Sequence, residues 1–315
     1  MRVLIALGGN AMTGPDGSAT PEEQDRAIGT ATEHIADLVA AGLGVVITHG
    51  NGPQVGNVLV KNELAAQVVP PVPLDWCGAQ TQGTIGFLIL DSLERALRAR
   101  GIDGRVAAVV SRTRVDGDDP GFQKPTKPIG RYLPAEEAQV LIDHGQIWED
   151  RGSKGWRRVV ASPEPLEIVD APAIAALADA GFVVVGSGGG GIPVVQDEHG
   201  DLRGVEAVID KDLAAALLAR AVGAEVLVIA TDVDHAVTGY GTADERPIGR
   251  VTPEEMRRLQ AEQGFASGSM GPKIEAAVRF VEHGGTRSAI TSLANITEAA
   301  RGETGTLIEK EQTTS

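Results

Sequence analysis

The chain opens with the stretch MRVLIALGGN (residues 1–10), which begins the pattern that decides the fold. Its apolar run, Arg2–Leu7, predicts a buried strand. Thr20-Pro21-Glu22-Glu23 then forms a capping box with proline at the first helical position, and apolar residues follow at helical spacing as far as Val39. Gly44–Thr48 predicts a second strand. A strand, a helix and a strand in this order indicate a parallel pair.

The same alternation continues toward the C-terminus. Further helices are expected around Gly78–Arg100, Asp170–Ala180, Asp212–Val222 and Pro272–His283. Further strands are expected at Arg105–Val110, Phe182–Val185, Val226–Ala230 and Arg287–Thr291. Because helices of ten or more residues separate the strands, we expect an α/β fold: a three-layer αβα sandwich around an open, mainly parallel sheet.

Two segments break this rhythm. Residues 113–160 are rich in proline, glycine and charge, with one short helix expected near Pro134–His144. We interpret them as a small protruding subdomain, acting either as a lid that moves about hinges such as Gly117 and Gly152–Gly155 or as a purely structural arm. Ile192–Ile209 holds two apolar runs around the turn-rich EHGDLRG, which predicts a β-hairpin.

The composition limits the class of protein and its surroundings. A chain of 315 residues with 42% hydrophobic content is long enough for one large or two medium domains. The net charge of −15 argues against nonspecific nucleic-acid binding, and no apolar window has the length of a membrane span. The single cysteine, Cys77, excludes an intramolecular disulfide and fits a reducing compartment. We therefore expect a cytoplasmic protein that binds neither nucleic acid nor membrane.

The distribution of lysines points to phosphate. The chain has 21 arginines but only seven lysines, and four of these lie in Gly/Pro-rich segments: Lys124, Lys127, Lys211 and Lys273. Backbone N–H groups and compact ammonium charges together neutralise phosphoryl oxygens. Because the chain is acidic overall, such a site would be a local positive island. The alternative is that these are surface lysines that fall in loops by chance.

Glycine-rich turns follow several of the expected strands. They are Gly8-Gly9-Asn10, His49–Gly56 (which includes Gly50, Asn51 and Gly52), Gly186–Gly191 and Thr231–Asp234. In open parallel sheets, ligands bind beyond the carboxyl ends of the strands, where glycine exposes the backbone. A single turn of this kind only reverses the chain, whereas several at one sheet edge favour a binding site.

Three known nucleotide-binding patterns do not fit. Gly186–Gly191 satisfies GxGxxG, with Asp210 and Asp212 about twenty residues later. A dinucleotide fingerprint requires a helix after the glycines, but Ile-Pro-Val-Val follows, which predicts a strand. The chain also has no GxxxxGK[ST] P-loop and no protein-kinase signature.

Two short segments suggest contacts to a ligand anion. Lys211 and Asp212 lie where the hairpin gives way to a helix, as either a surface ion pair of small value or a phosphoryl-binding lysine with its partner. Lys273 falls in the first turn of a helix, where its charge is unfavourable against the helix dipole. A bound anion would remove that penalty.

Taken together, eight motifs in order resemble carbamate kinase, of the amino acid kinase superfamily, from about Val3 to Thr306. They are LGGNA (7–11), HGNGPQVGN (49–57), TQGTIGF (81–87), KPTKPIG (124–130), GWRRVVASPEP (155–165), GGGGIPVV (188–195), VEAVIDKD (205–212) and SMGPKIEAAVRFVE (269–282). The resemblance implies Mg²⁺-dependent phosphoryl exchange between ATP and carbamate, giving ADP and carbamoyl phosphate. Family members usually run it toward ATP at the end of arginine catabolism. It also implies a homodimer and an eight-stranded sheet.

The resemblance also implies a domain layout. Residues 1–315 would form one amino-acid-kinase-type domain. Residues 1–205 would be the lobe for carbamate and the phosphoryl group, and 206–315 the nucleotide lobe. Mg²⁺ would be held through the phosphates of ATP or ADP, with no metal-binding residue of the protein itself.

Site roles follow from the same resemblance, motif by motif. Four residues would be catalytic, with Lys127 reaching in from the subdomain and Asp212 organising the other lysines: Lys127, Lys211, Asp212 and Lys273. Six would bind carbamate and the phosphoryl group: Gly8, Gly9, Asn10, Gly50, Asn51 and Gly52. Seven would bind the nucleotide: Thr231, Asp232, Asp234, Tyr240, Ser267, Met270 and Gly271.

The chain departs from the family in one place and leaves two other functions open. Many members read T-G-V-D where this chain reads Thr231-Asp232-Val233-Asp234, and the stretch that follows is longer here. This concerns contacts to the nucleotide base. The first alternative is a regulatory protein on the same fold that binds nucleotide or carbamoyl phosphate without catalysis. The second is a sister small-acid kinase, against which KPTKPIG argues.

Overall fold

The structure is a computed structural model that describes residues 1–9, 12, 20–263, 265 and 270–311. Its centre is an eight-stranded sheet with the order β15-β17-β16-β12-β1-β2-β9-β3. These strands are β15 (Arg250–Val251), β17 (Thr306–Glu309), β16 (Arg287–Ser292), β12 (Val226–Thr231), β1 (Arg2–Leu7), β2 (Gly44–His49), β9 (Val183–Val185) and β3 (Val106–Ala108). Every pair from β16 to β3 is parallel, whereas β17 pairs antiparallel with β16 and β15 pairs parallel with β17, so these two strands run opposite to the rest.

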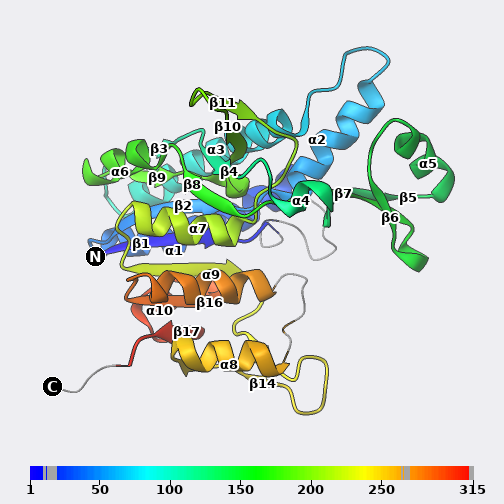
Figure 1. The fold of residues 1–315 in the computed structure, drawn as a ribbon. Helices are drawn as coiled ribbons and strands as arrows, with labels where there is room; N and C mark the ends of the chain where they lie inside the picture. Colours follow the sequence, from blue (N-terminus) through cyan, green and yellow to red (C-terminus); the bar gives the residue numbers. More distant parts are fainter. Residues whose placement is uncertain (10–11, 13–19, 264, 266–269, 312–315) are drawn as a thin grey trace.

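Both faces of this sheet are covered by helices (Figure 1). Strand β1 shows why, since all of its residues after Arg2 are buried and successive side chains point to opposite faces. Leu4 and Ala6 pack on the side of α6 (Ala171–Asp179), α7 (Lys211–Ala221) and α9 (Met270–Glu282). Val3, Ile5 and Leu7 pack on the side of α1 (Pro21–Ala40), α3 (Leu74–Ala99) and α10 (Ile296–Arg301). The expected three-layer αβα sandwich is therefore confirmed.

A second, four-stranded sheet lies beside the first, with the order β11-β10-β4-β8. It consists of β11 (Leu202–Gly204), β10 (Ile192–Gln196), β4 (Arg112–Val115) and β8 (Pro165–Ile168). Strands β10 and β11 pair antiparallel, so the hairpin expected within Ile192–Ile209 is confirmed. Further small elements among the described residues are β13 (Val237–Thr238), β14 (Arg246–Pro247), α4 (Pro120–Gln123), α8 (Pro253–Gln263) and short 3₁₀ helices at Gly152–Lys154, Gly188–Gly190 and Leu293–Asn295.

A third, three-stranded sheet stands out from the body of the molecule (Figure 1). It holds β5 (Lys127–Leu133), β7 (Trp156–Val160) and β6 (Trp148–Asp150), with α5 (Ala135–Asp143) between β5 and β6. Its own small core is formed by Leu133, Ala138 and Trp148. Since Thr113 lies in β4 of the second sheet, the protruding unit spans residues 127–160 and is narrower than the expected 113–160. Helix α2 (Gly52–Ala65) packs against β5.

The capping box at Thr20 is confirmed: its hydroxyl accepts a hydrogen bond from the Glu23 amide, and the Glu23 carboxylate accepts one from the Thr20 amide. Within the described part of the chain, no helix combines the length and the apolarity needed to cross a membrane.

Candidate active site

Three turns meet at the carboxyl edge of the central sheet. Because β12, β1 and β2 are neighbours and parallel, the turns after them lie side by side. The Gly8 amide donates to the Ala230 carbonyl at 2.8 Å, and the Gly50 amide donates to the Leu7 carbonyl at 2.8 Å. These bonds carry the strand ladder one residue into each turn and fix the turns against each other.

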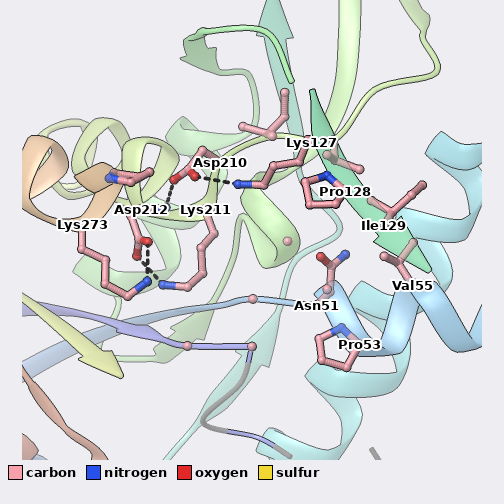
Figure 2. Close-up of a pocket in the computed structure, with 18 of the residues that line it drawn as sticks. Asn51, Pro53, Val55, Lys127, Pro128, Ile129, Asp210, Lys211, Asp212 and Lys273 are labelled. Carbon is pink, nitrogen blue, oxygen red and sulfur yellow. Dashed lines mark hydrogen bonds and ion pairs between the residues drawn. The ribbon is translucent and has the colours of Figure 1, made fainter. Parts of the chain in front are cut away.

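A cavity of about 210 Å³ opens at this edge (Figure 2). Its wall includes eleven of the residues expected from the sequence: Gly8, Gly9, Gly50, Asn51, Gly52, Lys127, Lys211, Asp212, Thr231, Asp232 and Lys273. They come from both halves of the chain and from the protruding unit. The structure thus brings together in one place most of the segments that the sequence analysis singled out.

Close backbone packing explains why these turns are rich in glycine. A side chain at Gly50 would collide with the backbone of Gly9 and would reach Lys211 Cδ at 3.1 Å. Gly189 has a φ of +66°, in the left-handed region, and a Cβ there would collide with the amide of Asn51. Asn51 Nδ2 donates in turn to Thr81 Oγ1 of α3 at 2.8 Å. The glycines therefore let three backbone segments and a lysine stem occupy one small volume.

Two lysines from different helices share one carboxylate (Figure 2). Lys211 begins α7 and Lys273 lies in the first turn of α9, and both Nζ atoms donate to Asp212, Lys273 at 3.3 Å from Oδ2 and Lys211 to Oδ1. Asp212 is only 3% exposed. Burial by itself raises the pKa of Asp212, but the two ammonium groups outweigh this and hold the pKa below its ordinary value. Two positive charges against one negative leave a local positive excess.

A second lysine–aspartate pair closes the opposite side of the cavity. Lys127, the first residue of β5, donates from Nζ to Asp210 Oδ2 at 3.1 Å. Asp210 is also the N-cap of α7, because its Oδ1 accepts from the amide of Asp212 at 3.0 Å. In the sequence, Asp210 stands out only as part of a misleading dinucleotide pattern. Its position directly before a helix and beside Lys211 is the sequence signal that could have marked it.

A buried histidine supports the turns from behind, and sequence reasoning missed it. His49, at the end of β2, is 1% exposed, and its Nδ1 lies 2.9 Å from the Gly50 carbonyl, to which it donates. Its ring fills the space against Gly188, where a Cβ would collide with it. Burial, opposed by the hydrogen bond to Gly50 and assisted by the nearby Lys211 charge, lowers the pKa of His49 to about 4. The imidazole is therefore neutral at physiological pH.

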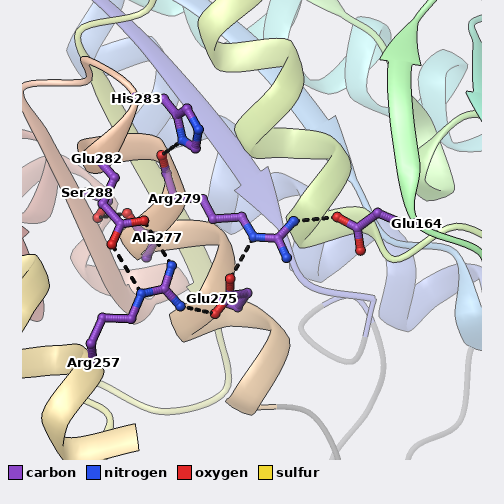
Figure 3. Close-up of polar contacts among 8 residues, drawn as sticks. All are labelled: Glu164, Arg257, Glu275, Ala277, Arg279, Glu282, His283 and Ser288. Atoms are coloured by element: carbon purple, nitrogen blue, oxygen red, sulfur yellow. Dashed lines mark hydrogen bonds and ion pairs between the residues drawn. The ribbon is translucent and has the colours of Figure 1, made fainter.

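An ion-pair network anchors helix α9, which carries Lys273 (Figure 3). Arg257 of α8 bonds Glu275 at 2.5 Å and Glu282 at 2.9 Å, and Arg279 bonds Glu275 at 2.6 Å. Arg279 also pairs with Glu164, in the segment before β8. Single exposed pairs contribute little, but this chain of pairs ties α9 to α8 and to the second sheet.

Fewer of the residues expected to bind the nucleotide line the cavity. Thr231 and Asp232 line the cavity and are joined by a 3.0 Å hydrogen bond from Thr231 Oγ1 to Asp232 Oδ1. Of the described residues, four expected ones lie outside its lining: Asp234, Tyr240, Met270 and Gly271. Asp234 accepts from Asn295 Nδ2 at 2.9 Å, and Tyr240 is 82% exposed. Asn10 and Ser267 fall outside the described residues. The nucleotide roles of these residues stay predictions.

The cavity has the chemistry of a site for a polyanion. Its described lining contains three lysines, three aspartates, of which two hold those lysines in place, and the backbone of several glycines. It contains no cysteine, histidine or serine that would act as a nucleophile. Such an arrangement can hold an anion, neutralise its charge and orient it for attack by a second substrate.

Known proteins with similar sequence and structure agree with this arrangement. The profile of the amino acid kinase family matches residues 1–292. The chain is 48% identical to the carbamate kinase of Thermococcus kodakarensis, over 98% of this chain and 99% of that protein. It is 44% identical to a carbamate kinase-like protein of Escherichia coli, over 98% of both chains. The structure of a Giardia lamblia carbamate kinase bound to AMP-PNP superposes with a TM-score of 0.93, at 40% identity and 98% coverage of both chains. The chain therefore belongs to the amino acid kinase family and, within it, to the carbamate kinase group.

Proposed function

We propose that this chain is an enzyme that catalyses reversible phosphoryl transfer between ATP and carbamate, giving ADP and carbamoyl phosphate. The observation that carries the proposal is the convergence of Lys211 and Lys273 on Asp212 at the glycine-lined cavity. Full-length identity of 48% to a carbamate kinase supports the same reaction.

The chemistry needs positioning and charge neutralisation more than a protein base. A carbamate oxygen attacks the terminal phosphorus of ATP, the bond to the bridging oxygen breaks, and ADP leaves with the electron pair. Lys211 and Lys273 neutralise the charge on the transferring phosphoryl oxygens, and Asp212 holds the two ammonium groups apart at a fixed spacing. Lys127 neutralises charge from the opposite wall. The backbone amides of Gly9, Asn51 and Gly52 supply N–H donors to the same oxygens, because those of Gly8 and Gly50 already bond to the Ala230 and Leu7 carbonyls.

ATP and ADP would lie over residues 206–315, and carbamate over residues 1–205. The AMP-PNP bound to the Giardia lamblia enzyme supports nucleotide binding in this fold. Among the described residues that are expected to bind the nucleotide, Thr231 and Asp232 line the cavity.

The residues of the cavity fit Mg²⁺ that is bound mainly through phosphates. Asp210 and Asp212 are each paired with lysine, which leaves Asp232 as a cavity carboxylate bonded only to the hydroxyl of Thr231 within the described structure. Mg²⁺ commonly takes one or two carboxylates together with phosphates and water. Bound there, it would supply positive charge between the phosphate oxygens. Activity should vanish with EDTA and return with Mg²⁺, and tightly bound stoichiometric zinc in the active enzyme would contradict this.

We also propose that the protein is cytoplasmic and forms a homodimer. We propose that it catalyses the reaction in the direction of ATP synthesis, in arginine catabolism. Two exposed aromatic side chains support a contact between two copies: Trp76 is 60% and Phe87 is 61% exposed on α3. They are eleven residues apart, about three turns, and therefore share one face of the helix. Phe87→Asp should convert a dimer to monomers in light scattering coupled to size exclusion. A wild-type protein that is monomeric at high concentration would refute the homodimer.

One assay decides the function. Purified protein is mixed with ADP, carbamoyl phosphate and Mg²⁺, and ATP formation is followed with a luciferase readout. If the chain is a carbamate kinase, ATP should form rapidly, whereas a regulatory protein would bind these ligands without turnover. A sister small-acid kinase would form ADP from ATP with another carboxylate and leave carbamoyl phosphate untouched. Arg26→Ala is a suitable control variant, because Arg26 is an exposed residue of α1 and does not line the cavity.

A further inference from the structure

Asp210 links the start of α7 to the protruding unit through its side chain. Its two carboxylate oxygens have different partners: Oδ1 caps α7 through the amides of Asp212 at 3.0 Å and Leu213 at 3.4 Å, and Oδ2 accepts from Lys127 Nζ at 3.1 Å. Lys127 is 83 residues away in sequence and belongs to the protruding unit (Figure 2).

We propose that Asp210 is a positioning residue that holds Lys127 over the cavity and aligns it with the lysine pair on Asp212. This deepens the proposed function and rests on it, since it assigns a residue that serves the same phosphoryl site. Asp210 touches a lysine and a helix terminus and acts on the substrate only through them.

The geometry supports positioning over a purely structural role. Asp210 is one residue from Lys211 and two from Asp212, so its cap fixes the start of the helix from which both of these side chains project. The same carboxylate then fixes the ammonium of Lys127 relative to that helix. Asp210 has a side chain that is 15% exposed, whereas that of Lys127 is 38% exposed. Lys127 is therefore free enough to be misplaced once its anchor is gone.

Charge explains what the anchor does before substrate arrives. Without a counter-charge, the ammonium of Lys127 is repelled by Lys211 and Lys273, which share a single carboxylate. The Asp210 carboxylate offsets this repulsion and keeps Lys127 at the cavity wall. When an anionic substrate enters, its oxygens occupy the remaining donor positions of an ammonium group that has three.

One substitution separates the two roles of Asp210, the N-cap of α7 and the ion pair with Lys127. Asparagine is as good an N-cap as aspartate, so Asp210→Asn keeps the cap on α7 and removes the charge that attracts Lys127. We expect the KM for carbamoyl phosphate to rise roughly three- to tenfold, the size of a partly exposed charge-assisted hydrogen bond, with the KM for ADP nearly unchanged. Glu63→Gln is the matched control: Glu63 pairs with Arg131 of the same β5 at 3.5 Å but does not line the cavity.

A double-mutant cycle with Lys127 gives the decisive result. If Asp210 acts through Lys127, adding Asp210→Asn to Lys127→Ala should change the KM less than twofold, whereas independent effects would multiply. Effects that multiply would overturn the proposal. A lower KM in Asp210→Asn would also overturn it, because it would mean that the carboxylate had held Lys127 away from the substrate.

A measurement without catalysis keeps this test apart from the identity of the reaction. In hydrogen exchange of the substrate-free protein, Asp210→Asn should speed exchange in Lys127–Leu133 as much as Lys127→Ala does and leave α7 protected. Unchanged exchange in β5 would refute the anchor even if the enzyme is active. Faster exchange in a protein without carbamate kinase activity would keep the anchor and reject the proposed function.

Discussion

The amide nitrogen of Gly9 lies 2.6 Å from the position that a Cβ on Gly50 would occupy. Two turns from neighbouring parallel strands thus pack backbone against backbone, and no side chain larger than hydrogen fits between them. Because the same Cβ would also approach Lys211 Cδ at 3.1 Å, this contact sets the position of a lysine as well as of two turns.

Gly50→Ala should therefore damage the site more than the fold. Overpacking of this kind costs about 1–3 kcal/mol, and the backbone shift that relieves it moves the donors of both turns. We expect a loss of at least tenfold in kcat/KM for carbamoyl phosphate, measured beside chemical denaturation. Gly29→Ala is the control, since a Cβ at this position in α1 meets nothing within 4 Å. Wild-type kinetics in Gly50→Ala would show that the close approach has no functional consequence.

Substitution of the two lysines on Asp212 tests the charge on the transferring group. Lys211→Ala and Lys273→Ala should each lower kcat by ~10²–10⁴-fold through loss of electrostatic stabilisation. Arginine should restore little, because a planar guanidinium cannot replace a compact ammonium in this buried geometry. Lys61→Ala, at an exposed position of α2, should keep full turnover. Turnover near the wild-type level in both alanine variants, with folding verified by circular dichroism, would remove these residues from the mechanism.

Much of this site follows from the sequence, because parallel strands place their carboxyl ends at one edge. That rule is enough to bring Gly8, Gly50 and Thr231 together without any knowledge of the packing. It also locates Lys211 and Lys273, which begin helices on the same side of the sheet. Local patterns therefore predicted the central sheet and the cavity wall.

The rest depends on contacts that no local pattern contains. The pairing of Asp210 with Lys127 arises because β5 of a separate three-stranded sheet, which packs against α2, begins beside the N-terminus of α7. The burial of His49 depends on Gly188 from another strand end. The ends of some helices and strands differ from the expected ones for similar reasons. Helix α3 begins at Leu74, four residues before the expected start, and only Val106–Ala108 of the expected strand pairs, because β3 is an edge with β9 as its single neighbour.

The buried imidazole of His49 predicts a specific pH dependence of stability. Its pKa falls from 6.5 to about 4 on folding, so the unfolded chain binds a proton that the folded protein excludes between these values. The contribution of the neutral His49 ring to the free energy of unfolding is complete above pH 6.5. It declines by about 3 kcal/mol in all as the pH falls toward 4. Urea unfolding at pH 6.5 and 4.5 should show a smaller decline in His49→Gln than in wild type. Equal declines in the two proteins would contradict the assigned burial of a neutral ring, and exposed His199→Gln should behave as wild type.

We expect the protruding unit to act as a lid bearing Lys127. Gly152–Gly155 form the turn between β6 and β7, at the far end of the unit, so they are not its hinge as the sequence had suggested. The chain instead enters the unit just before Lys127 and leaves it just after Val160, and movement about these two points would carry β5 and Lys127 as one rigid piece.

A lid and a structural arm differ in what Lys127→Ala does. For a lid, carbamoyl-phosphate turnover should fall by ~10²-fold or more while ADP affinity, measured by calorimetry, stays almost constant. A structural arm would instead give lower stability or altered assembly. Hydrogen exchange provides the independent measurement: residues 127–160 should become more protected when both substrates are present, whereas the β10–β11 hairpin, which lies in another sheet, should not change. Equal exchange of residues 127–160 in the two states, together with full activity of Lys127→Ala, would rule out a lid, because a rigid arm whose lysine is dispensable neither closes on the substrate nor neutralises its charge.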